Sequence, residues 1–186
     1  SVPVEPGLAL LLSTPTQSFA ATARPAPRRP WPDPLPGDID LDTLVDAAVD
    51  EGLAQVGPGN QGFVPLALAD DPEGQSQYPV GWYRHDGNLI VYGIGGSGTT
   101  TTLTSLALSL ARTQSPDDLH MYAMDFGAGE LAAVAPLPHV GAVILAAERE
   151  RQTRLMRFLR AELDRRRDLG AAAVRQEPAI VTFVDV

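Results

Sequence analysis

The sequence has no cysteine and no lysine, and it has only three histidines. Without cysteine the chain can form neither a disulfide framework nor a thiolate-ligated metal site. The histidines, His85, His120 and His139, lack the short spacings of metal ligands, which disfavours a histidine metal site. All fourteen basic residues are arginine. Apart from a protonated histidine, any cationic side chain that meets a bound anion must therefore be an arginine.

Long hydrophobic runs are also missing. The longest apolar stretch, residues 131–147, is interrupted by Pro136, Pro138 and His139 and falls short of the ~20 residues that span a bilayer. The first residues contain an apolar run of five without a positively charged region before it, which is not the pattern of a signal peptide. Because the first residue is not methionine and the last lies in an apolar run, we expect a piece of a longer chain.

The chain has 186 residues, of which 44% are hydrophobic and 20% charged, with a net charge of −9. These values are typical of one soluble globular domain, with or without an appendage. A free-standing nucleic-acid-binding protein normally carries positive charge, because neutralising phosphates dominates its affinity. The acidic balance therefore argues against nucleic acid as a partner.

Residues 1–36 differ from the rest of the chain. Residues 8–12 and 18–23 are each predicted to form a short strand. Residues 24–36 contain six prolines in thirteen residues, which indicates an extended linker because proline disrupts helices and central strands. The alternative is a proline-rich ligand for an aromatic groove. The main domain is then predicted to cover residues 37–186.

The beginning of this domain is predicted to contain one helix and few strands. Leu41, Leu44, Val45 and Ala48 share one helical face, with Asp40 or Asp42 as the N-cap. Residues 52–87 are rich in glycine, proline and acidic side chains, which indicates loops around a short strand at residues 63–67.

From residue 88 strands and helices alternate. Apolar runs predict strands at residues 89–92, 119–124, 141–145 and 179–184. Helical spacing predicts a helix beginning near residue 100, with the apolar positions Leu103, Leu106, Ala107, Leu110 and Ala111, and a second at residues 148–169 with Leu155, Phe158, Leu159 and Leu163 on its apolar side. Alternating strands and helices imply an α/β fold with a mostly parallel sheet, in which 89–92 and 180–184 are expected to be neighbours.

Residues 93–100, GIGGSGTT, lie between a predicted strand and a predicted helix. Glycines at this position let backbone N–H groups surround a phosphate at a helix N-terminus. The pattern matches the phosphate-loop template at Gly93, Gly98 and Thr100, but Thr99 occupies the lysine position. The candidate nucleotide-binding residues are Gly93, Gly95, Gly96, Ser97, Gly98, Thr99 and Thr100. A purely structural strand-to-helix turn remains the alternative.

Asp185 ends the last apolar strand, as the Mg²⁺-binding aspartate of a Walker B strand does. With the loop, it suggests a site in which Thr100 and Asp185 hold Mg²⁺ and Asp185 takes part in catalysis. An apolar strand ending in aspartate is weak evidence alone. The glycine loop strengthens this interpretation.

These motifs resemble the FtsK/SpoIIIE family of P-loop ATPases. The resemblance rests on GNLIVYGIGGSGTT, on residues 106–144, on RLMRFLRAELDRRR and on the Asp185 strand. The patterns Asp125-Phe-Gly-x-Gly and Leu137-Pro-His-Val-Gly141, with the upstream VPLALADDPEGQSQYPVGW, are more narrowly similar to the second and third ATPase modules of EccC-type type VII secretion motors.

The resemblance implies a RecA-like domain of a tandem-ATPase chain that is anchored at a bacterial membrane and works in hexameric rings on the cytoplasmic side. It implies ATP and Mg²⁺ as cofactors, and sibling modules and the signal peptide of a secreted protein as partners, with no membrane contact by this segment. It also places Asp125 at the nucleotide site or a ring interface, whereas the residues alone equally allow Asp125 to cap a loop.

Four features depart from the family pattern. Thr99 replaces the lysine, Asp185 is followed by Val186 instead of a second acidic residue, Asp125-Phe126-Gly127 stands where DNA-pumping members have Asp-Pro-Lys, and the stretch 167–178 is short. Each charge-assisted bond of the missing lysine contributes about 1.5–3 kcal/mol. We therefore expect a degenerate module with weak nucleotide binding and little hydrolysis. A DNA translocase motor and a pure interaction module are the alternatives.

Three other features have structural interpretations beside functional ones. Eight arginines on the helix 148–169 alternate with acids, which favours a salt-bridged, solvated face over a subunit contact. His139 is interpreted as a turn residue in preference to a catalytic one. Trp31 and Trp82 are interpreted as packing residues in preference to partner anchors.

Overall fold

The computed structural model describes residues 31–54 and 62–186. The chain divides into two compact units, Ser1–Asp33 and Pro34–Val186, and the fold below is that of the second. The strands predicted at residues 8–12 and 18–23 lie outside the described residues, as does most of the predicted linker. The domain boundary after residue 36 stays a prediction.

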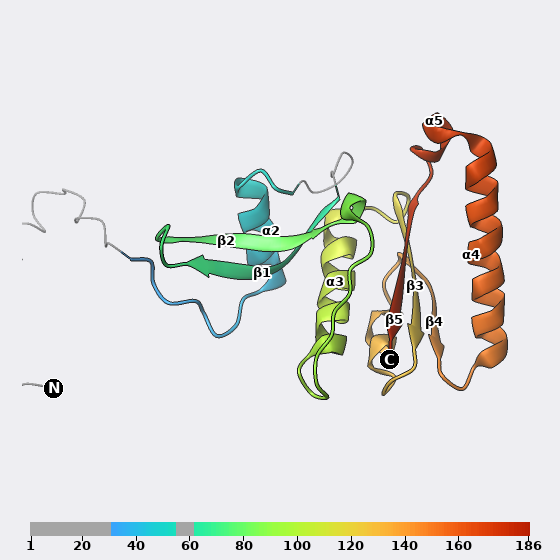
Figure 1. Cartoon of the computed structure of the whole chain (residues 1–186), viewed down its shortest axis with the longest axis horizontal. Helices are drawn as coiled ribbons and strands as arrows, with labels where there is room; N and C mark the ends of the chain where they lie inside the picture. Colours follow the sequence, from blue (N-terminus) through green and yellow to red (C-terminus); the bar gives the residue numbers. More distant parts are fainter. Residues whose placement is uncertain (1–30, 55–61) are drawn as a thin grey trace, which may run out of the picture. The chain divides into compact units, whose positions relative to one another are not determined.

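A three-stranded parallel sheet forms the centre of the second unit (Figure 1). Its strands, in spatial order, are β4 (Val140–Leu145), β3 (Leu119–Asp125) and β5 (Ala179–Asp185). Strands β3 and β5 pair in register to their last residues, so Asp125 lies opposite Asp185 at the carboxyl edge of the sheet. The predicted α/β class with a parallel sheet is confirmed.

Helices cover both faces of this sheet. The helix α3 (Thr99–Thr113) lies on one face together with the short helix η2 (Glu130–Val134), and α4 (Arg149–Leu169) lies on the other (Figure 1). A short helix, α5 (Ala171–Val174), follows α4 and precedes β5. The helices predicted near residue 100 and at residues 148–169 are therefore both present.

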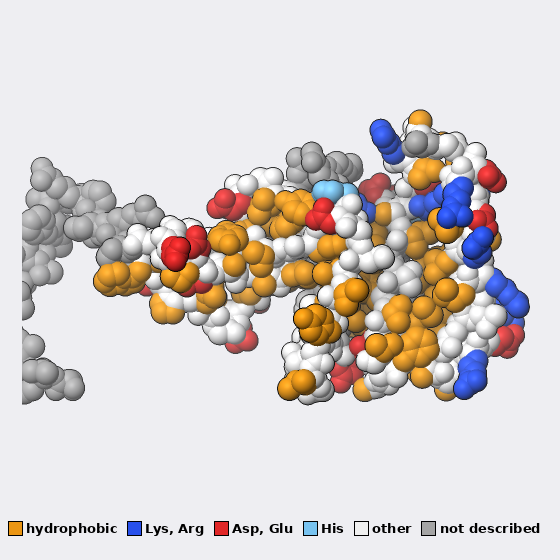
Figure 2. Space-filling view, viewed as in Figure 1, with side chains coloured by type: hydrophobic (Ala, Val, Ile, Leu, Met, Phe, Trp, Pro, Cys, Tyr) orange, Lys and Arg blue, Asp and Glu red, His pale blue; other side chains and the backbone are white. Residues whose placement is uncertain are grey.

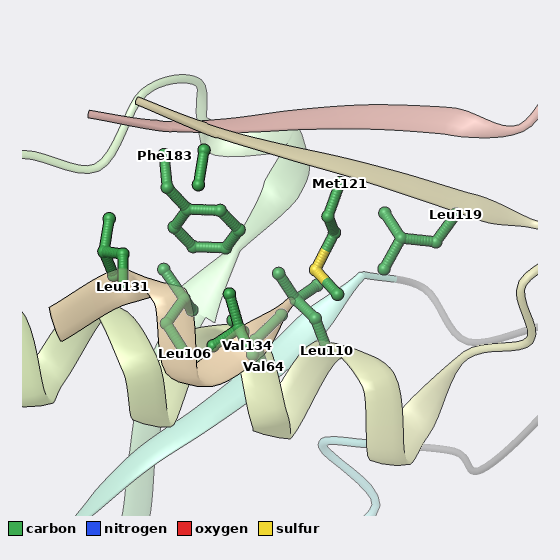
Figure 3. Packing of buried hydrophobic residues seen from close by; sticks show 10 residues of the cluster. Val64, Leu106, Leu110, Leu119, Met121, Leu131, Val134 and Phe183 are labelled. Atoms are coloured by element: carbon green, nitrogen blue, oxygen red, sulfur yellow. The ribbon is translucent and has the colours of Figure 1, made fainter. Parts of the chain in front are cut away.

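The main core lies between α3 and the sheet. Strand β3 alternates buried and less buried residues, as the period of a strand requires. Each fully buried large apolar side chain contributes about 1.5–3 kcal/mol. The labelled side chains in Figure 3 are Val64, Leu106, Leu110, Leu119, Met121, Leu131, Val134 and Phe183.

An antiparallel hairpin precedes the sheet in the sequence. It consists of β1 (Phe63–Asp71) and β2 (Ser76–Tyr83), and the helix α2 (Leu41–Asp50) packs against it. Phe63 forms a small buried cluster with Ala48 of α2. The helix was predicted correctly. The prediction of loops at residues 52–87 was wrong, because β1 is longer than expected and β2, which contains proline and glycine, was missed.

The hairpin is fixed to α3 by packing and by one buried hydrogen bond. Val64 belongs to the main core, and the Ser109 hydroxyl donates to the Pro65 carbonyl at 2.9 Å. Ser109 is fully buried, so this bond satisfies a hydroxyl that would otherwise be costly to bury.

The strand predicted at residues 89–92 does not form. This segment is extended but belongs to no sheet, and β5 pairs only with β3 among the described strands. Ile90 is 81% exposed and Tyr92 is 92% exposed. The apolar sequence favours a strand, but a strand also needs a hydrogen-bonding neighbour, and none of the described residues provides one. The expected pairing with residues 180–184 was therefore wrong.

Only part of the predicted apolar side of α4 is buried. Leu155 is buried, whereas Phe158 and Leu163 are each 46% exposed. The ring of Phe158 lies 5.5 Å from that of Tyr122 in β3, and this contact connects the helix to the sheet. The charged face is salt-bridged as predicted, with pairs such as Arg154 to Glu150 along the helix, and Figure 2 shows these charges gathered along α4.

Candidate functional site

The glycine loop immediately before α3 is a compact turn. Gly96 and Gly98 have φ angles of 79° and 89°, which glycine adopts without strain. Gly93 lies so close to Ser97 that any side chain at position 93 would collide with the serine hydroxyl. The local sequence therefore specifies this turn through its glycines.

The space around the loop is open and contains unpaired donors. A side chain built on Gly95, Gly96 or Gly98 would meet no atom within 4 Å. Gly98 is the N-cap of α3, and no side chain caps this end of the helix. The backbone N–H groups of the first helical turn, beginning with Thr99, therefore have no intrahelical acceptors, which is the arrangement that binds anions.

A hydroxyl from the first turn of α3 contacts the end of β5. The Thr100 Oγ1 donates a 3.0 Å hydrogen bond to Oδ2 of Asp185. Asp185 is only 7% exposed. A hydroxyl oxygen and a carboxylate oxygen are hard donors of the kind that Mg²⁺ prefers. The structure thus brings together the two residues that the sequence analysis assigned to the metal.

Asp125 lies at the same carboxyl edge of the sheet, but it bonds to the loop that follows β3. Its Oδ1 accepts hydrogen bonds from the N–H groups of Gly127 and Gly129 at 3.0 and 3.1 Å, and its Oδ2 accepts one from Leu131 at 2.9 Å. Its side chain is 1% exposed. Both oxygens therefore hold the loop after β3, which is the loop-capping alternative that the residues left open. A direct role of Asp125 toward nucleotide stays a prediction.

The two carboxylates flank one glycine. A Cβ at Gly127 would lie 3.3 Å from Oδ2 of Asp185 and 3.6 Å from Oδ1 of Asp125. A Cβ at position 127 would therefore crowd the Asp185 carboxylate and make an ordinary contact with that of Asp125. No role was predicted for Gly127, although the Asp-x-Gly-x-Gly pattern suggests a carboxylate that caps a glycine turn.

No arginine among the described residues stands in for the missing lysine. A groove is lined by Gly93, Thr99 and Asp185, and Arg84 is the only arginine of residues 31–54 and 62–186 that also lines it. Burial lowers the pKa of Arg84 and the charge of Asp118 opposes that shift. Asp118 immediately precedes β3, whereas the glycine loop meets the sheet at the carboxyl end of β5. Arg84 therefore lies at the opposite end of the sheet from the loop.

His139 and Trp82, which were considered above as candidate functional residues, make contacts that fit a structural role. The His139 Nε2 is 2.9 Å from the carbonyl oxygen of Gln114, and the ring is 5% exposed. The Trp82 Nε1 donates to the Gly87 carbonyl at 3.2 Å, and its ring packs on the main core. Both agree with the structural interpretation. Trp31 is 69% exposed.

The described residues contain neither a membrane-spanning helix nor a cluster of metal-ligating side chains. Within residues 31–54 and 62–186 no helix is both long and apolar enough to cross a bilayer. Over the same ranges no three side chains of histidine, aspartate or glutamate gather as a metal cluster would. A metal at Thr100 and Asp185 would thus need further ligands from nucleotide or water.

Comparison with known sequences identifies relatives of this arrangement. The model of the FtsK/SpoIIIE family matches residues 64–178. The type VII secretion system protein EssC of Staphylococcus aureus is 32% identical over 143 residues, which is 76% of this chain and 10% of the relative. The chain thus spans about a tenth of the length of that relative.

Solved structures agree with the sequence comparison. The cytoplasmic domain of the Thermomonospora curvata type VII secretion ATPase EccC matches 67% of this chain and 17% of its own, with a TM-score of 0.64 and 26% identity. ATPases 2 and 3 of the same EccC, in complex with a signal sequence peptide, match 67% of this chain and 26% of theirs, with a TM-score of 0.50 and 29% identity.

Proposed function

Because the chain belongs to the FtsK/SpoIIIE family, we propose that it is a degenerate ATPase module of a type VII protein secretion motor. In this proposal the module binds nucleotide weakly, or binds a substrate or partner segment, and hydrolyses little ATP itself. The single observation that carries the proposal is the loop at the start of α3, where Thr99 replaces the lysine while the Thr100–Asp185 contact is retained.

The residues fit a nucleotide only in part. The open glycine turn and the uncapped N–H groups of α3 suit phosphate oxygens, and Thr100 with Asp185 suits Mg²⁺. Bound Mg²⁺ would neutralise phosphate charge. The chain itself would orient the phosphates through the backbone of Gly95 to Thr100 and hold Asp185 through the Thr100 hydroxyl.

We expect weak hydrolysis because position 99 lacks the positive charge of a lysine. A threonine hydroxyl at position 99 is short and neutral, so it cannot stabilise the negative charge that develops on the transferred phosphoryl group. Asp185 is the remaining candidate catalytic residue. The described residues offer no arginine at the loop in compensation.

The proposed partners are sibling ATPase modules and the signal peptide of a secreted protein. Support comes from the T. curvata EccC structure, whose ATPases 2 and 3 are in complex with a signal sequence peptide. The proposed location is the cytoplasmic side of a bacterial membrane, in a membrane-anchored hexameric protein, since the matched T. curvata structure is a cytoplasmic domain. Direct membrane contact by this segment is not part of the proposal.

A DNA translocase is the second candidate, and charge argues against it. The net charge is −9, and most arginines of α4 are already paired with acids within the helix, for example Arg160 with Asp164 at 2.9 Å. Paired, solvated arginines have little charge left for phosphates.

The proposal is tested by calorimetry with ATP and Mg²⁺ beside a steady-state phosphate-release assay on the 186-residue chain. We expect weak binding and negligible turnover. Thr99→Lys should tighten ATP binding by about tenfold or more, because it restores a charge-assisted bond. Thr99→Val, which has the same shape without the hydroxyl, is the matched control and should change little. Turnover of the unmodified chain near the 1–100 s⁻¹ of kinases would refute the proposal.

A further inference from the structure

The outward face of α4 carries a shallow hollow of about 610 Å³. Four of the residues that line it follow the spacing i, i+3, i+4 and i+7 along the helix, and they are Thr153, Met156, Arg157 and Arg160. Four side chains at this spacing form the hole into which one side chain of a packing helix inserts. The hollow therefore has the shape that receives a second helix.

The hollow has an apolar residue on one side. Met156 is 53% exposed, whereas Leu155, on the side of α4 that packs on the sheet, is buried. A methionine side chain is flexible and adapts to the shape of a partner. The hollow can therefore bury apolar area against a side chain that enters it.

The border of the hollow carries unpaired positive charge. The helix α4 has eight arginines and four acidic residues. Six of these arginines pair with acids in or beside the helix. Within the described residues, Arg149 and Arg157 have no acidic partner. They are eight residues apart, which is ~12 Å along a helix. An occupant of the hollow should therefore carry acidic side chains.

The chain itself contains an acidic helix of this kind. Residues 33–51 have seven acidic side chains and no basic one. In α2, Asp42, Asp46 and Asp50 recur every four residues and so form one stripe, and Val49 lies in the same stripe with 39% of its surface exposed. Asp42 pairs with Arg112, whereas Asp46 and Asp50 have no cationic partner among the described residues.

We propose that the hollow on α4 receives the helix α2 of a second copy of this chain. Val49 enters the hollow beside Met156, and the acidic stripe faces Arg149 and Arg157. The inference goes beyond the proposed function, because it requires neither nucleotide nor a secreted substrate. The ATP calorimetry described above and the test below can therefore fail independently.

The α2 of the same chain does not reach this hollow. It packs against the hairpin and α3, and α3 lies on the face of the sheet opposite to α4 (Figure 1). The contact thus joins two different surfaces of two copies, so a pair still has one free α2 and one free α4, and further copies can add in the same way. A ten-residue helix buries less than the ~1,000 Å² of a stable interface. The association is therefore weak and sensitive to salt.

A nucleic acid fits the hollow less well than α2 does. Its phosphates would neutralise Arg149 and Arg157, but they would leave Met156 exposed to water. The α2 stripe supplies acidic groups and an apolar side chain together. The net charge of −9 also opposes binding of a polyanion to the chain as a whole.

Disulfide trapping tests the contact, because the chain has no cysteine of its own. The Met156→Cys chain is mixed with the Val49→Cys chain under mild oxidation, and a size tag on one chain identifies the mixed dimer. The matched control is Leu108→Cys, since Leu108 of α3 is 40% exposed and Val49 is 39% exposed. At about 0.01 M salt we expect the mixed disulfide with Val49→Cys to form at least about tenfold faster than the control. The difference should disappear at about 1 M salt, where the Debye length falls from ~30 Å to ~3 Å.

A charge exchange tests the assigned partners. Arg157→Glu in the Met156→Cys chain should slow the mixed disulfide by about tenfold or more, because it places two acids against each other. Adding Asp46→Arg to the Val49→Cys chain should restore the rate. Circular dichroism and melting temperatures confirm that each variant is folded.

Two exposed positions outside α2 and α4 provide controls with the same changes in net charge. Arg175→Glu and Asp117→Arg should leave the rate of trapping unchanged. Equal slowing by these controls would mean that net charge alone governs the encounter, which overturns the proposal.

Each alternative occupant of the hollow also has its own result, and each overturns the proposal. Faster trapping of two Met156→Cys chains with each other than with Val49→Cys means that two α4 helices meet. Trapping no faster than the Leu108→Cys control means that α2 does not dock there. Binding of a DNA duplex that Arg157→Glu abolishes, without such trapping, assigns the hollow to a polyanion.

Discussion

The Thr100 hydroxyl and the Asp185 carboxylate form a 3.0 Å hydrogen bond across 85 residues of sequence. The bond joins the first turn of α3 to the last residue of β5. It fixes the helix N-terminus against the carboxyl edge of the sheet, with the loop beside it. The relative position of the loop and the acid therefore depends on this contact and on the core beneath it.

The first prediction concerns this bond. Thr100→Val keeps the shape of the side chain but leaves the poorly exposed Asp185 carboxylate without its donor, which should lower the free energy of unfolding by about 1–3 kcal/mol. Urea unfolding followed by circular dichroism measures the change. Thr100→Ser should keep most of the stability, and Thr101→Val, at an exposed position in the same turn, controls for helix propensity. Equal stability of the Val and Ser variants at 100 would show that the bond is dispensable.

The second prediction concerns Asp125. Asp125→Ala removes the acceptor for three backbone N–H groups, and each hydrogen bond to a charged group contributes about 1.5–3 kcal/mol. We expect a loss of at least about 3 kcal/mol in urea unfolding. Asp117→Ala, at an exposed loop position, should be within about 0.5 kcal/mol of the parent chain. A small effect of Asp125→Ala would mean that these three hydrogen bonds are not needed to hold the loop after β3.

The third prediction concerns pH. Hydrogen bonds from Arg165 and Arg166 lower the pKa of Glu162 from 4.5 to about 2 in the folded chain. The folded state therefore binds this proton more weakly than the unfolded state does. The resulting stability is complete above about pH 4.5 and is lost as the pH falls toward 2.

Glu162→Gln should remove this part of the acid dependence. The variant should be less stable than the parent chain at pH 6, and the difference should shrink as the pH falls from 4.5 toward 2. Melting temperatures across this range measure it. Glu150→Gln, in a pair whose side chains are 73% and 79% exposed, is the control and should have little effect at any pH. A pH-independent difference for Glu162→Gln would contradict the assigned pKa.

Local patterns were sufficient to predict α2, α3 and the strands of the parallel sheet. In α3 the apolar spacing and the preceding glycines agree, so sequence and packing favour the same structure. Strand β2 was missed because Pro79 and Gly81 weaken its strand signal, and its pairing with β1 supplies what propensity lacks. Residues 89–92 show the opposite case. Their apolar sequence predicts a strand, but pairing depends on a neighbour that no local pattern can reveal.

The candidate site was predictable where a motif sets the spacing. Residues 93–100 and Asp185 were identified in this way, and the structure places Thr100 against Asp185. The use of both Asp125 oxygens by the following loop was left open, because the sequence shows that an acid precedes a glycine turn but not which way its carboxylate points.

The last prediction concerns the contact between Gly141 of β4 and Tyr122 of β3. A Cβ at position 141 would lie 2.6 Å from a ring carbon of Tyr122, and the Tyr122 ring also packs against that of Phe158. Because an aromatic ring cannot bend away, Gly141→Ala should displace it and cost about 1–3 kcal/mol, as overpacking does elsewhere. Urea unfolding measures the loss.

Two further variants separate this clash from the general effect of replacing glycine. Gly37→Ala adds a methyl group where no atom lies within 4 Å and should not destabilise the chain. Tyr122→Ala removes the ring, so adding Gly141→Ala to it should cost much less than in the parent chain. The coupling energy of this double-mutant cycle then measures the contact itself. If Gly141→Ala costs the same with and without the ring, the close approach of Tyr122 is not the reason that glycine occupies this position.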